Sequence, residues 1–213
     1  MPRKSSKVDP TWLHDHLTDP YVRQAQRDGY RARSAYKLQA LDEQFRLVKP
    51  GMRIVDLGAA PGAWSQYLSR KLAGSGRIVA LDLLPMEPVE AVEVILGDFR
   101  DEAVLAELEA RTGPEPLDLV VSDMAPNLSG IAAADAARMD DLLQIALDFA
   151  SRHLKPDGAL VAKAFHGSGF SQTVEAWKSR FERVKEVKPP ASRAKSAETF
   201  LVGIRPKRLN PHG

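Results

Sequence analysis

The 213-residue sequence has no cysteine and only five histidines. The absence of cysteine excludes disulfides, thiolate metal sites and cysteine nucleophiles. The histidines form no cluster with metal-ligand spacing, so we expect no metal site. No apolar run approaches the roughly 20 residues that cross a bilayer, and no apolar stretch follows the basic N-terminus as in a secretory signal. We therefore expect a cytoplasmic protein with no membrane partner.

Acidic residues are scarce at both ends of the chain, and basic residues are scarce in its middle. Residues 1–53 hold 11 Lys or Arg against 6 Asp or Glu, residues 54–177 hold 9 against 19, and residues 178–213 hold 10 against 3. The corresponding net charges are +5, −10 and +7, around a total of +2. Two basic ends around an acidic middle indicate a surface for a polyanion such as nucleic acid. Ordinary solvated faces are the alternative.

Apolar runs alternate with amphipathic segments along most of the chain. This alternation predicts an α/β protein with a doubly wound, mostly parallel sheet of seven strands and helices on both faces. The expected strands span 53–57, 77–82, 92–96, 117–122, 158–165, 182–188 and 199–205. The expected helices span 63–73, 101–111, 135–154 and 169–180. No clear helix separates the last two strands, so we expect an antiparallel C-terminal strand.

The length suits one α/β domain with a full core. We expect a basic N-terminal extension over residues 1–29, a single domain over 30–207 and a tail over 208–213, and we expect a monomer. In the extension, residues 11–28 favour short helical pieces broken at Pro20. Ser34 is a candidate N-cap for the helix that follows it.

A buried strand, a turn of small residues and a helix start follow one another in Ile54-Val-Asp-Leu-Gly58-Ala-Ala-Pro-Gly62-Ala-Trp64. Small residues let the backbone approach a ligand, and a helix N-terminus offers unpaired N–H groups. Asp56, Asp82 and Asp98 end or follow three successive strands, where ligands of parallel sheets bind. A dinucleotide would favour Gly-x-Gly-x-x-Gly, whereas Pro61 removes a donor that phosphates need. A ligand with adenosine but no phosphate, such as S-adenosylmethionine, fits better.

Ionisable residues also end the fourth and fifth predicted strands. Asp123 follows the fourth strand, and Lys163 lies near the end of the otherwise apolar fifth strand. A lysine there is unusual because desolvating an ammonium is costly unless the charge is paired. The alternative is a side chain that reaches out to solvent. Lys37 and Glu198 pose the same question, and each is ordinary when taken alone.

Taken together, these segments resemble the FtsJ/RrmJ family. The similarity extends from about Trp12 to about Gly203 and is carried by several motifs in the same order. They are Ser34-x-x-Lys37-Leu, Asp56-Leu-Gly-Ala-Ala-Pro-Gly62-x-Trp64-Ser-Gln-Tyr, Asp82-Leu-Leu-Pro-Met, Gly97-Asp98-Phe-Arg-Asp-Glu, Ser122-Asp-Met-Ala-Pro-Asn127 and Ser192-Arg-Ala-Lys-Ser196-x-Glu198. The family comprises bacterial 2′-O-ribose methyltransferases that act on a uridine in the A-loop of 23S ribosomal RNA.

The resemblance implies a Rossmann-like class I methyltransferase that uses S-adenosylmethionine. It implies a Lys-Asp-Lys-Glu catalytic tetrad at Lys37, Asp123, Lys163 and Glu198. Together with the glycine turn, it implies a cofactor site that comprises Gly58, Gly62, Trp64, Asp82, Asp98 and Asp123. The implied partner is 23S rRNA, in the large ribosomal subunit. The sequence departs from the family pattern in two places, at Ala63 in the turn and in Ala164-Phe-His166-Gly-Ser168-Gly after the second lysine, and neither departure touches the tetrad.

The tetrad leaves two mechanisms open. Lys163 can act as the general base on the ribose hydroxyl if it is partly neutral, a state that burial and the charge of Lys37 favour. If Lys163 stays charged, it orients the hydroxyl and Asp123 accepts the proton. In the basic ends, the candidates for RNA phosphate contacts are Arg31, Arg33, Lys188, Arg193 and Lys195. The alternative functions are a tRNA 2′-O-methyltransferase and a non-catalytic ribosome-assembly factor, with an NAD-dependent oxidoreductase disfavoured by the turn.

Overall fold

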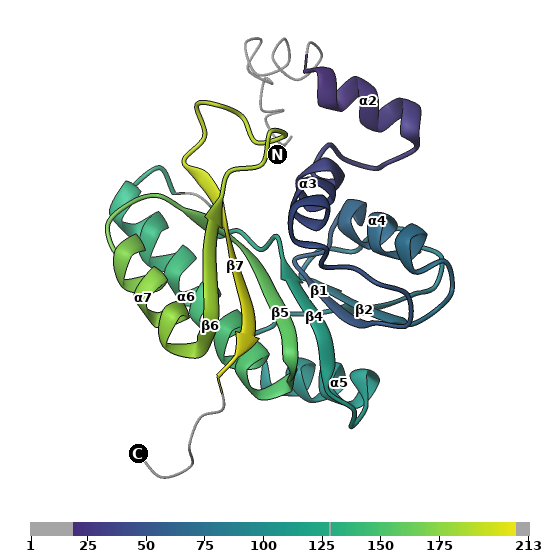
Figure 1. Cartoon of the computed structure of the whole chain (residues 1–213). Helices are drawn as coiled ribbons and strands as arrows, with labels where there is room; N and C mark the ends of the chain where they lie inside the picture. The colour runs from purple at the N-terminus through teal and green to yellow at the C-terminus, as the bar shows by residue number, and fades with distance from the viewer. Residues whose placement is uncertain (1–18, 128, 208–213) are drawn as a thin grey trace, which may run out of the picture.

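The computed structural model describes residues 19–127 and 129–207. At its centre lies a seven-stranded sheet with the order β3-β2-β1-β4-β5-β7-β6 (Figure 1). The strands are β1 (Arg53–Leu57), β2 (Arg77–Asp82), β3 (Val92–Leu96), β4 (Leu117–Ser122), β5 (Leu154–Phe165), β6 (Phe181–Val187) and β7 (Glu198–Pro206). The strands β1 to β5 are parallel, and β7 is antiparallel to both β5 and β6. The predicted sheet is confirmed.

One strand differs from its expected bounds by several residues. The strand β5 begins at Leu154 rather than at Gly158. Leu154 pairs with Leu117 of β4, and the register then shifts before Leu119 pairs with Ala159. The sequence did not reveal this start, because Lys155, Pro156 and Asp157 are typical of a turn.

Helices cover both faces of the sheet, as predicted. They are α2 (Pro20–Asp28), α3 (Ala35–Phe45), α4 (Ala63–Leu72), α5 (Glu102–Thr112), α6 (Ala132–His153) and α7 (Phe170–Arg180). In β1, Val55 and Leu57 join a buried cluster with residues of α5, α6 and α7, whereas Ile54 joins one with residues of α3 and α4. Successive strand residues point to opposite faces, so a continuous apolar strand contributes to two cores. No helix in the described residues is long and apolar enough to span a membrane.

The described part of the N-terminal extension is one regular helix. It starts at Pro20, where the break was expected and where the fixed φ and missing N–H of proline are tolerated. The expected helical segment before Pro20 lies outside the described residues. Asp19 caps this helix by accepting a hydrogen bond from the backbone N–H of Tyr21 at 2.9 Å. Ser34 lies at the N-cap of α3 but is itself helical, and its side chain makes no capping hydrogen bond. Residues 1–18 and 208–213 lie outside the described residues, so the domain bounds stay a prediction.

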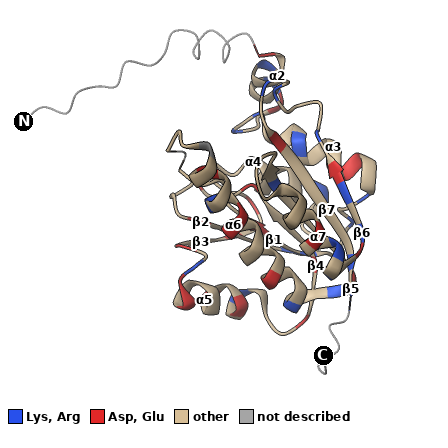
Figure 2. Cartoon of the chain, turned by 90° about the vertical axis from the view of Figure 1, so that its left-hand side faces the viewer, with Lys and Arg blue, Asp and Glu red and all other residues tan. Residues whose placement is uncertain are grey.

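The two basic ends of the sequence meet in space. Arg33 makes an ion pair with Asp19 and donates a hydrogen bond to the carbonyl oxygen of Ala191. Nε of Arg193 lies 3.9 Å from Oδ2 of the same Asp19. The loop between β6 and β7 therefore lies beside the N-terminal segment, at the same end of the sheet (Figure 1). Figure 2 shows Lys and Arg positions on α2 and acidic positions on α5.

Candidate active site

The candidate site lies at the carboxyl ends of the central strands, where parallel α/β sheets bind their ligands. Backbone hydrogen bonds fix the loops that leave these strands. The N–H of Gly58, after β1, donates to the carbonyl of Leu81 in β2 at 2.8 Å. The N–H of Asp123, after β4, donates to the carbonyl of Leu57 in β1 at 3.0 Å. The turn after β1 and the loop after β4 are thereby held side by side.

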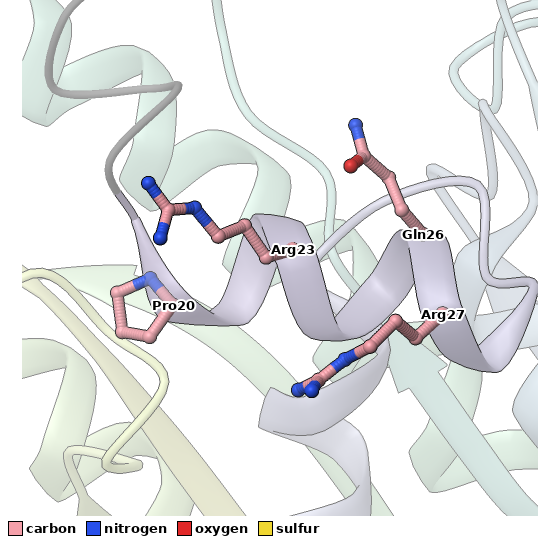
Figure 3. A pocket seen from close by; sticks show the side chains of 4 residues that line it. All are labelled: Pro20, Arg23, Gln26 and Arg27. Carbon is pink, nitrogen blue, oxygen red and sulfur yellow. The ribbon is translucent and has the colours of Figure 1, made fainter.

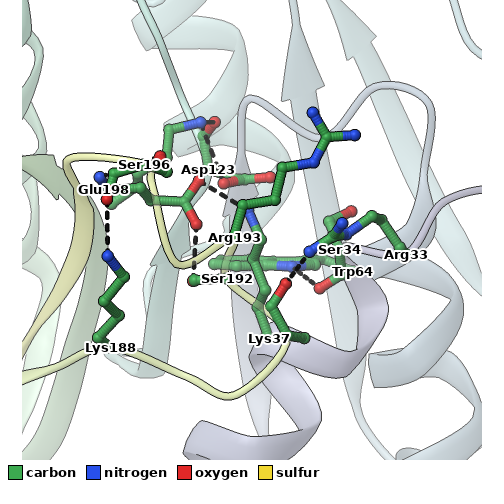
Figure 4. A network of polar contacts seen from close by, with 12 residues as sticks. Arg33, Ser34, Lys37, Trp64, Asp123, Lys188, Ser192, Arg193, Ser196 and Glu198 are labelled. Atoms are coloured by element: carbon green, nitrogen blue, oxygen red, sulfur yellow. Dashed lines mark hydrogen bonds and ion pairs between the residues drawn. The ribbon is translucent and has the colours of Figure 1, made fainter. Parts of the chain in front are cut away.

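The four residues of the predicted tetrad form two ion pairs at this end of the sheet. Nζ of Lys37 lies 2.6 Å from Oε2 of Glu198 (Figure 4). Nζ of Lys163 lies 3.1 Å from Oδ1 of Asp123 and donates a hydrogen bond to its backbone carbonyl at 2.6 Å. Lys163 and Glu198 are only 8% and 9% exposed. Lys163 is thus a buried, paired lysine and does not reach out to solvent.

The strand β7 carries Glu198 and so brings the Lys37–Glu198 pair close to Lys163 in β5. It is inserted beside β5, where Phe200 pairs with Lys163 and Glu198 with Phe165. The ring of Phe200 lies 5.8 Å from that of Trp64, and Nζ of Lys37 lies 5.8 Å from the Phe200 centroid. The sequence analysis did not single out Phe200, because an aromatic residue in a strand is ordinary.

Glu198 is held by partners from two other segments. Burial acts to raise the pKa of its carboxyl group, but the charge and hydrogen bond of Lys37 lower it, and the net pKa lies below the ordinary value. Ser192 contributes to this lowering by donating from Oγ to Oε1 of Glu198 at 2.8 Å. Ser192 occurs in the family motif, yet only the structure shows that its hydroxyl orients the carboxylate (Figure 4).

Ser34 and Trp64 link the tetrad to the predicted cofactor turn. Nε1 of Trp64, in the first turn of α4, donates to the backbone carbonyl of Ser34 at 2.8 Å (Figure 4). Ser34 directly precedes α3, the helix that carries Lys37. Its carbonyl, rather than the hydroxyl expected to cap the helix, therefore makes the important contact.

The glycine turn after β1 is packed too closely for other residues at two positions. Gly58 has a φ of 72°, and a Cβ there would lie 2.6 Å from the backbone nitrogen of Met124. Gly62 has a φ of 102°, and a Cβ there would lie 2.7 Å from NH1 of Arg31. Both positions favour glycine for its backbone conformation as well as for space.

Asp82 and Asp98 have different surroundings. Asp82 accepts backbone N–H bonds from Ala60 and Leu84, both at 2.8 Å. Asp98 is bound by the guanidinium of Arg100, whose hydrogen bonds lower the pKa of Asp98. Exposed apolar side chains accompany the two acids, namely Leu83, Leu84 and Leu96. Carboxylate acceptors beside apolar surface suit the hydroxyls and base of a nucleoside.

Asp56 is fully buried at the end of β1. Its Oδ2 accepts a hydrogen bond from Ser65 at 2.6 Å, whereas its Oδ1 has no partner among the described residues. Burial raises the pKa of Asp56 to about 7, and the charges of Asp123 and Asp82 add to the effect. Oδ1 of Asp123 is also buried without a hydrogen bond from the described residues. Of these two oxygens, Oδ1 of Asp123 still lies 3.1 Å from Nζ of Lys163, so its partner is the charge of the ion pair.

The five predicted RNA contacts fall into two groups. Arg31, Arg33 and Lys188 donate hydrogen bonds to backbone carbonyls within the chain. Arg193 and Lys195 lie on the β6–β7 loop with exposed side chains, although Arg193 is within 3.9 Å of Asp19. Whether any of them contacts RNA stays a prediction. Nε2 of His166, one of the departures from the family pattern, lies 2.7 Å from Oε1 of Glu186.

A hollow of about 610 Å³ lies along α2, and its described lining includes no tetrad residue (Figure 3). Its described lining is Pro20, Arg23, Gln26 and Arg27, which belong to one helix. A ligand site needs polar groups that converge from several elements, so we assign no site to it. Residues 19–127 and 129–207 contain no group of three His, Asp or Glu side chains arranged to hold a metal ion.

Comparison with known proteins decides the family, because a model described as FtsJ-like methyltransferase matches residues 30–205. The chain belongs to the FtsJ-like methyltransferase family. A protein from Methylibium petroleiphilum is 60% identical over 94% of this chain and 96% of its own length. One from Paracidovorax citrulli is 56% identical over the same shares. Both relatives are named ribosomal RNA large subunit methyltransferase E.

Solved structures agree with this assignment. A Plasmodium falciparum structure, named as a ribosomal RNA methyltransferase, has a TM-score of 0.72 and 25% identity over 83% of this chain and 98% of its own. Fibrillarin from Aeropyrum pernix, solved with S-adenosylmethionine bound, has a TM-score of 0.58 and 20% identity over 80% of this chain and 76% of its own. The fibrillarin likeness supports the Rossmann-like methyltransferase fold alone.

Proposed function

We propose that this FtsJ-like chain transfers a methyl group from S-adenosylmethionine to the ribose 2′-hydroxyl of a uridine in the A-loop of 23S rRNA, on the large ribosomal subunit. The proposal rests on one observation: two ion pairs, Lys37 with Glu198 and Lys163 with Asp123, lie at the same end of the sheet. The names of the relatives support a ribosomal RNA substrate. The uridine and the A-loop rest on the family resemblance. We further propose that the protein acts in the cytoplasm as a monomer.

The residues at the strand ends suit the proposed cofactor. Gly58 and Gly62 permit the tight turn after β1, Asp82 and Asp98 hold carboxylates at the next two strand ends, and Trp64 and Asp123 complete the set. When bound, S-adenosylmethionine supplies a methyl group activated on a sulfonium centre. The protein must then align the ribose oxygen with that methyl group and handle the proton of the hydroxyl.

We propose Lys163 as the acceptor of this proton. A neutral amine has two N–H groups, and these can point at the backbone oxygen and Oδ1 of Asp123, 2.6 and 3.1 Å away. Its lone pair is then available to the ribose hydroxyl. In the alternative, Lys163 stays charged and orients the hydroxyl while the Asp123 carboxylate accepts the proton.

A single-turnover pH–rate profile separates these roles. A general base gives a rate that rises with pH as the amine loses its proton. Lys163→Arg keeps a positive charge that cannot be lost at these pH values. If Lys163 is the base, the Arg variant loses activity at every pH. An Arg variant with near-parent activity would leave Lys163 an orienting role.

The function itself is tested by methyl transfer from labelled S-adenosylmethionine to large ribosomal subunits, free 23S rRNA and bulk tRNA. We expect label on subunits or 23S rRNA with the parent and its loss with Lys163→Ala. Lys155→Ala is the matched control, because Lys155 lies in the same strand and pairs with Asp118 at 2.7 Å outside the tetrad. Label on tRNA alone would change the substrate. Cofactor binding without transfer would favour an assembly factor, and binding of NAD instead an oxidoreductase.

A further inference from the structure

Arg31 occupies an unexpected place for a predicted RNA contact. Its NH1 donates to the carbonyl oxygens of Pro61 at 3.0 Å and Glu87 at 2.6 Å, and its NH2 donates to that of Pro88 at 2.7 Å. Pro61 belongs to the glycine turn after β1, whereas Glu87 and Pro88 belong to the connection between β2 and β3. One guanidinium therefore joins two segments that follow neighbouring strands.

Arg31 complements Asp82, which joins the same two segments. Asp82 accepts backbone N–H groups, one from Ala60 in the turn and one from Leu84 in the connection. Arg31 binds carbonyl groups of both segments. A carboxylate only accepts hydrogen bonds and a guanidinium only donates them. The two side chains together satisfy backbone groups of both polarities and fix one segment against the other.

Packing at Gly62 depends on the same contact. A Cβ at Gly62 would lie 2.7 Å from NH1 of Arg31, 3.2 Å from Cγ2 of Val89 and 3.4 Å from Sδ of Met86. The guanidinium and the β2–β3 connection thus lie directly against the turn. The backbone of Arg31 is held as well, because its N–H donates to Oε1 of Gln66 on α4 at 2.8 Å.

We propose that Arg31 is a positioning residue for the cofactor: it fastens the turn at residues 58–62 to the β2–β3 connection and so shapes the S-adenosylmethionine site. This inference rests on the proposed cofactor, but it gives Arg31 a role distinct from RNA binding. Three of its five N–H groups are used by carbonyls. Its loss releases those carbonyls to water and loosens both segments, so it weakens cofactor binding more than it slows the chemical step.

The first test follows amide hydrogen exchange in the protein without cofactor. We expect faster exchange in peptides covering 57–64 and 83–91 in Arg31→Gln than in the parent. Arg70→Gln is the matched control. Arg70 donates to the carbonyls of Asp28 and Gly29 and lies 4.3 Å from the Tyr30 ring, so it fastens the extension without touching the β2–β3 connection. Unchanged exchange in Arg31→Gln, or the same change in Arg70→Gln, would overturn the proposal.

The second test separates the role from RNA binding and from general folding. We expect the Kd for S-adenosylhomocysteine, measured by calorimetry, to rise at least tenfold in Arg31→Gln and less in Arg31→Lys, which keeps one donor group. The Michaelis constant for the cofactor should rise with kcat largely kept, and the salt dependence of RNA affinity should not change. An unchanged Kd with a shallower salt dependence would make Arg31 an RNA contact instead. Failure of the parent to bind either cofactor form would refute the proposed function itself.

Discussion

Nζ of Lys37 lies 2.6 Å from Oε2 of Glu198, although one residue precedes the first strand of the sheet and the other begins the last. Both side chains are nearly buried. A buried ion pair needs further partners to offset desolvation, and Ser192 supplies one to Glu198. The pair therefore matters for the fold as well as for the proposed chemistry.

Glu198→Gln should lower the free energy of unfolding by about 3–5 kcal/mol at pH 7.5, because it leaves the buried Lys37 without a counter-charge. The folded-state pKa of Glu198 is lowered, so its contribution is present above its ordinary pKa of 4.5 and is lost as the pH falls below that value. Urea unfolding at pH 7.5 and near pH 4 measures the difference between parent and variant. The difference should shrink at the lower pH.

Glu93→Gln is the control for this experiment. It removes the half-exposed ion pair with Arg77, and such pairs contribute about 1 kcal/mol or less. A loss in Glu198→Gln no larger than that in Glu93→Gln would show that the buried pair does not stabilise the fold.

Asp56 should make the protein less stable as the pH rises. Its folded-state pKa is about 7 and its unfolded-state pKa is near 3.9, so between these values the folded state binds the extra proton. Relative to Asp56→Asn, the parent should lose up to about 4 kcal/mol of unfolding free energy from pH 4 to pH 7, with no further loss above. Chemical denaturation across this range measures it.

Ser65→Ala tests the pKa of Asp56 in a second way. The Ser65 hydroxyl donates to Asp56 and lowers its pKa, so its removal should raise that pKa and extend the loss of stability above pH 7. Parallel pH profiles for parent, Asp56→Asn and Ser65→Ala would mean that Asp56 titrates normally.

Gly58→Ala should combine backbone strain with a steric clash. The left-handed conformation alone costs a non-glycine residue about 1–2 kcal/mol. Gly51 has a φ of 82°, and no atom of the described residues lies within 4 Å of the place a Cβ would take there, so Gly51→Ala measures this strain alone. At Gly58 the methyl also meets the backbone of Met124, and we expect a total of at least about 3 kcal/mol. Thermal unfolding and calorimetric cofactor binding should separate the two variants, and equal losses would contradict the packing argument.

Asp82→Asn should weaken cofactor binding by roughly tenfold or more and lower the unfolding free energy by about 1–3 kcal/mol. The Ala60 and Leu84 N–H groups bond different carboxylate oxygens, so the NH₂ group of asparagine, which only donates, would face one of them. Asp101→Asn is the control, because Asp101 caps α5 through the N–H of Ala103 at 2.9 Å and asparagine caps helices equally well. Calorimetry on both variants decides the outcome, and equal cofactor affinities would remove Asp82 from the site.

A double variant with Arg193→Gln and Lys195→Gln should bind RNA more weakly, and its RNA affinity should depend less on salt. Each lost phosphate contact lowers the slope of log affinity against log salt by about 0.7–0.9. The control is Arg205→Gln with Lys207→Gln, because Arg205 and Lys207 lie at the opposite end of β7 from Glu198. Filter binding to 23S rRNA fragments across a salt series gives both slopes. If neutralising all five predicted contacts changed neither affinity nor slope, the proposed RNA face would be wrong.

Hydrophobic pattern was enough to predict the architecture. The strands β1 to β4 have the bounds that their apolar runs predicted, because parallel strands inside a sheet are largely apolar on both faces. The start of β5 was missed because Lys155, Pro156 and Asp157 look like a turn, and only pairing with β4 reveals the strand.

The residues of the tetrad could be named from motifs, but their pairing could not. Which acid faces Lys37 depends on the insertion of β7 beside β5, and that is a property of the sheet order. Likewise, nothing in a run of sequence shows that Arg31 will meet three carbonyls from other segments. The distribution of charge along the sequence indicates a polyanionic partner. Whether a given Lys or Arg side chain faces that partner or binds backbone carbonyls of its own chain depends on the folded structure around it.

The insertion of β7 also bears on the order in which the protein is made. Synthesis runs from the N-terminus, so β5 leaves the ribosome well before the strand that covers its edge. Until β7 arrives, β5 presents unpaired N–H and C=O groups to solvent, a feature that promotes association between chains. Until then, Lys37 also lacks its ion-pair partner Glu198. A chain that ends before residue 198 therefore has neither the complete tetrad nor a protected sheet, and the site is completed only when the last strand is in place.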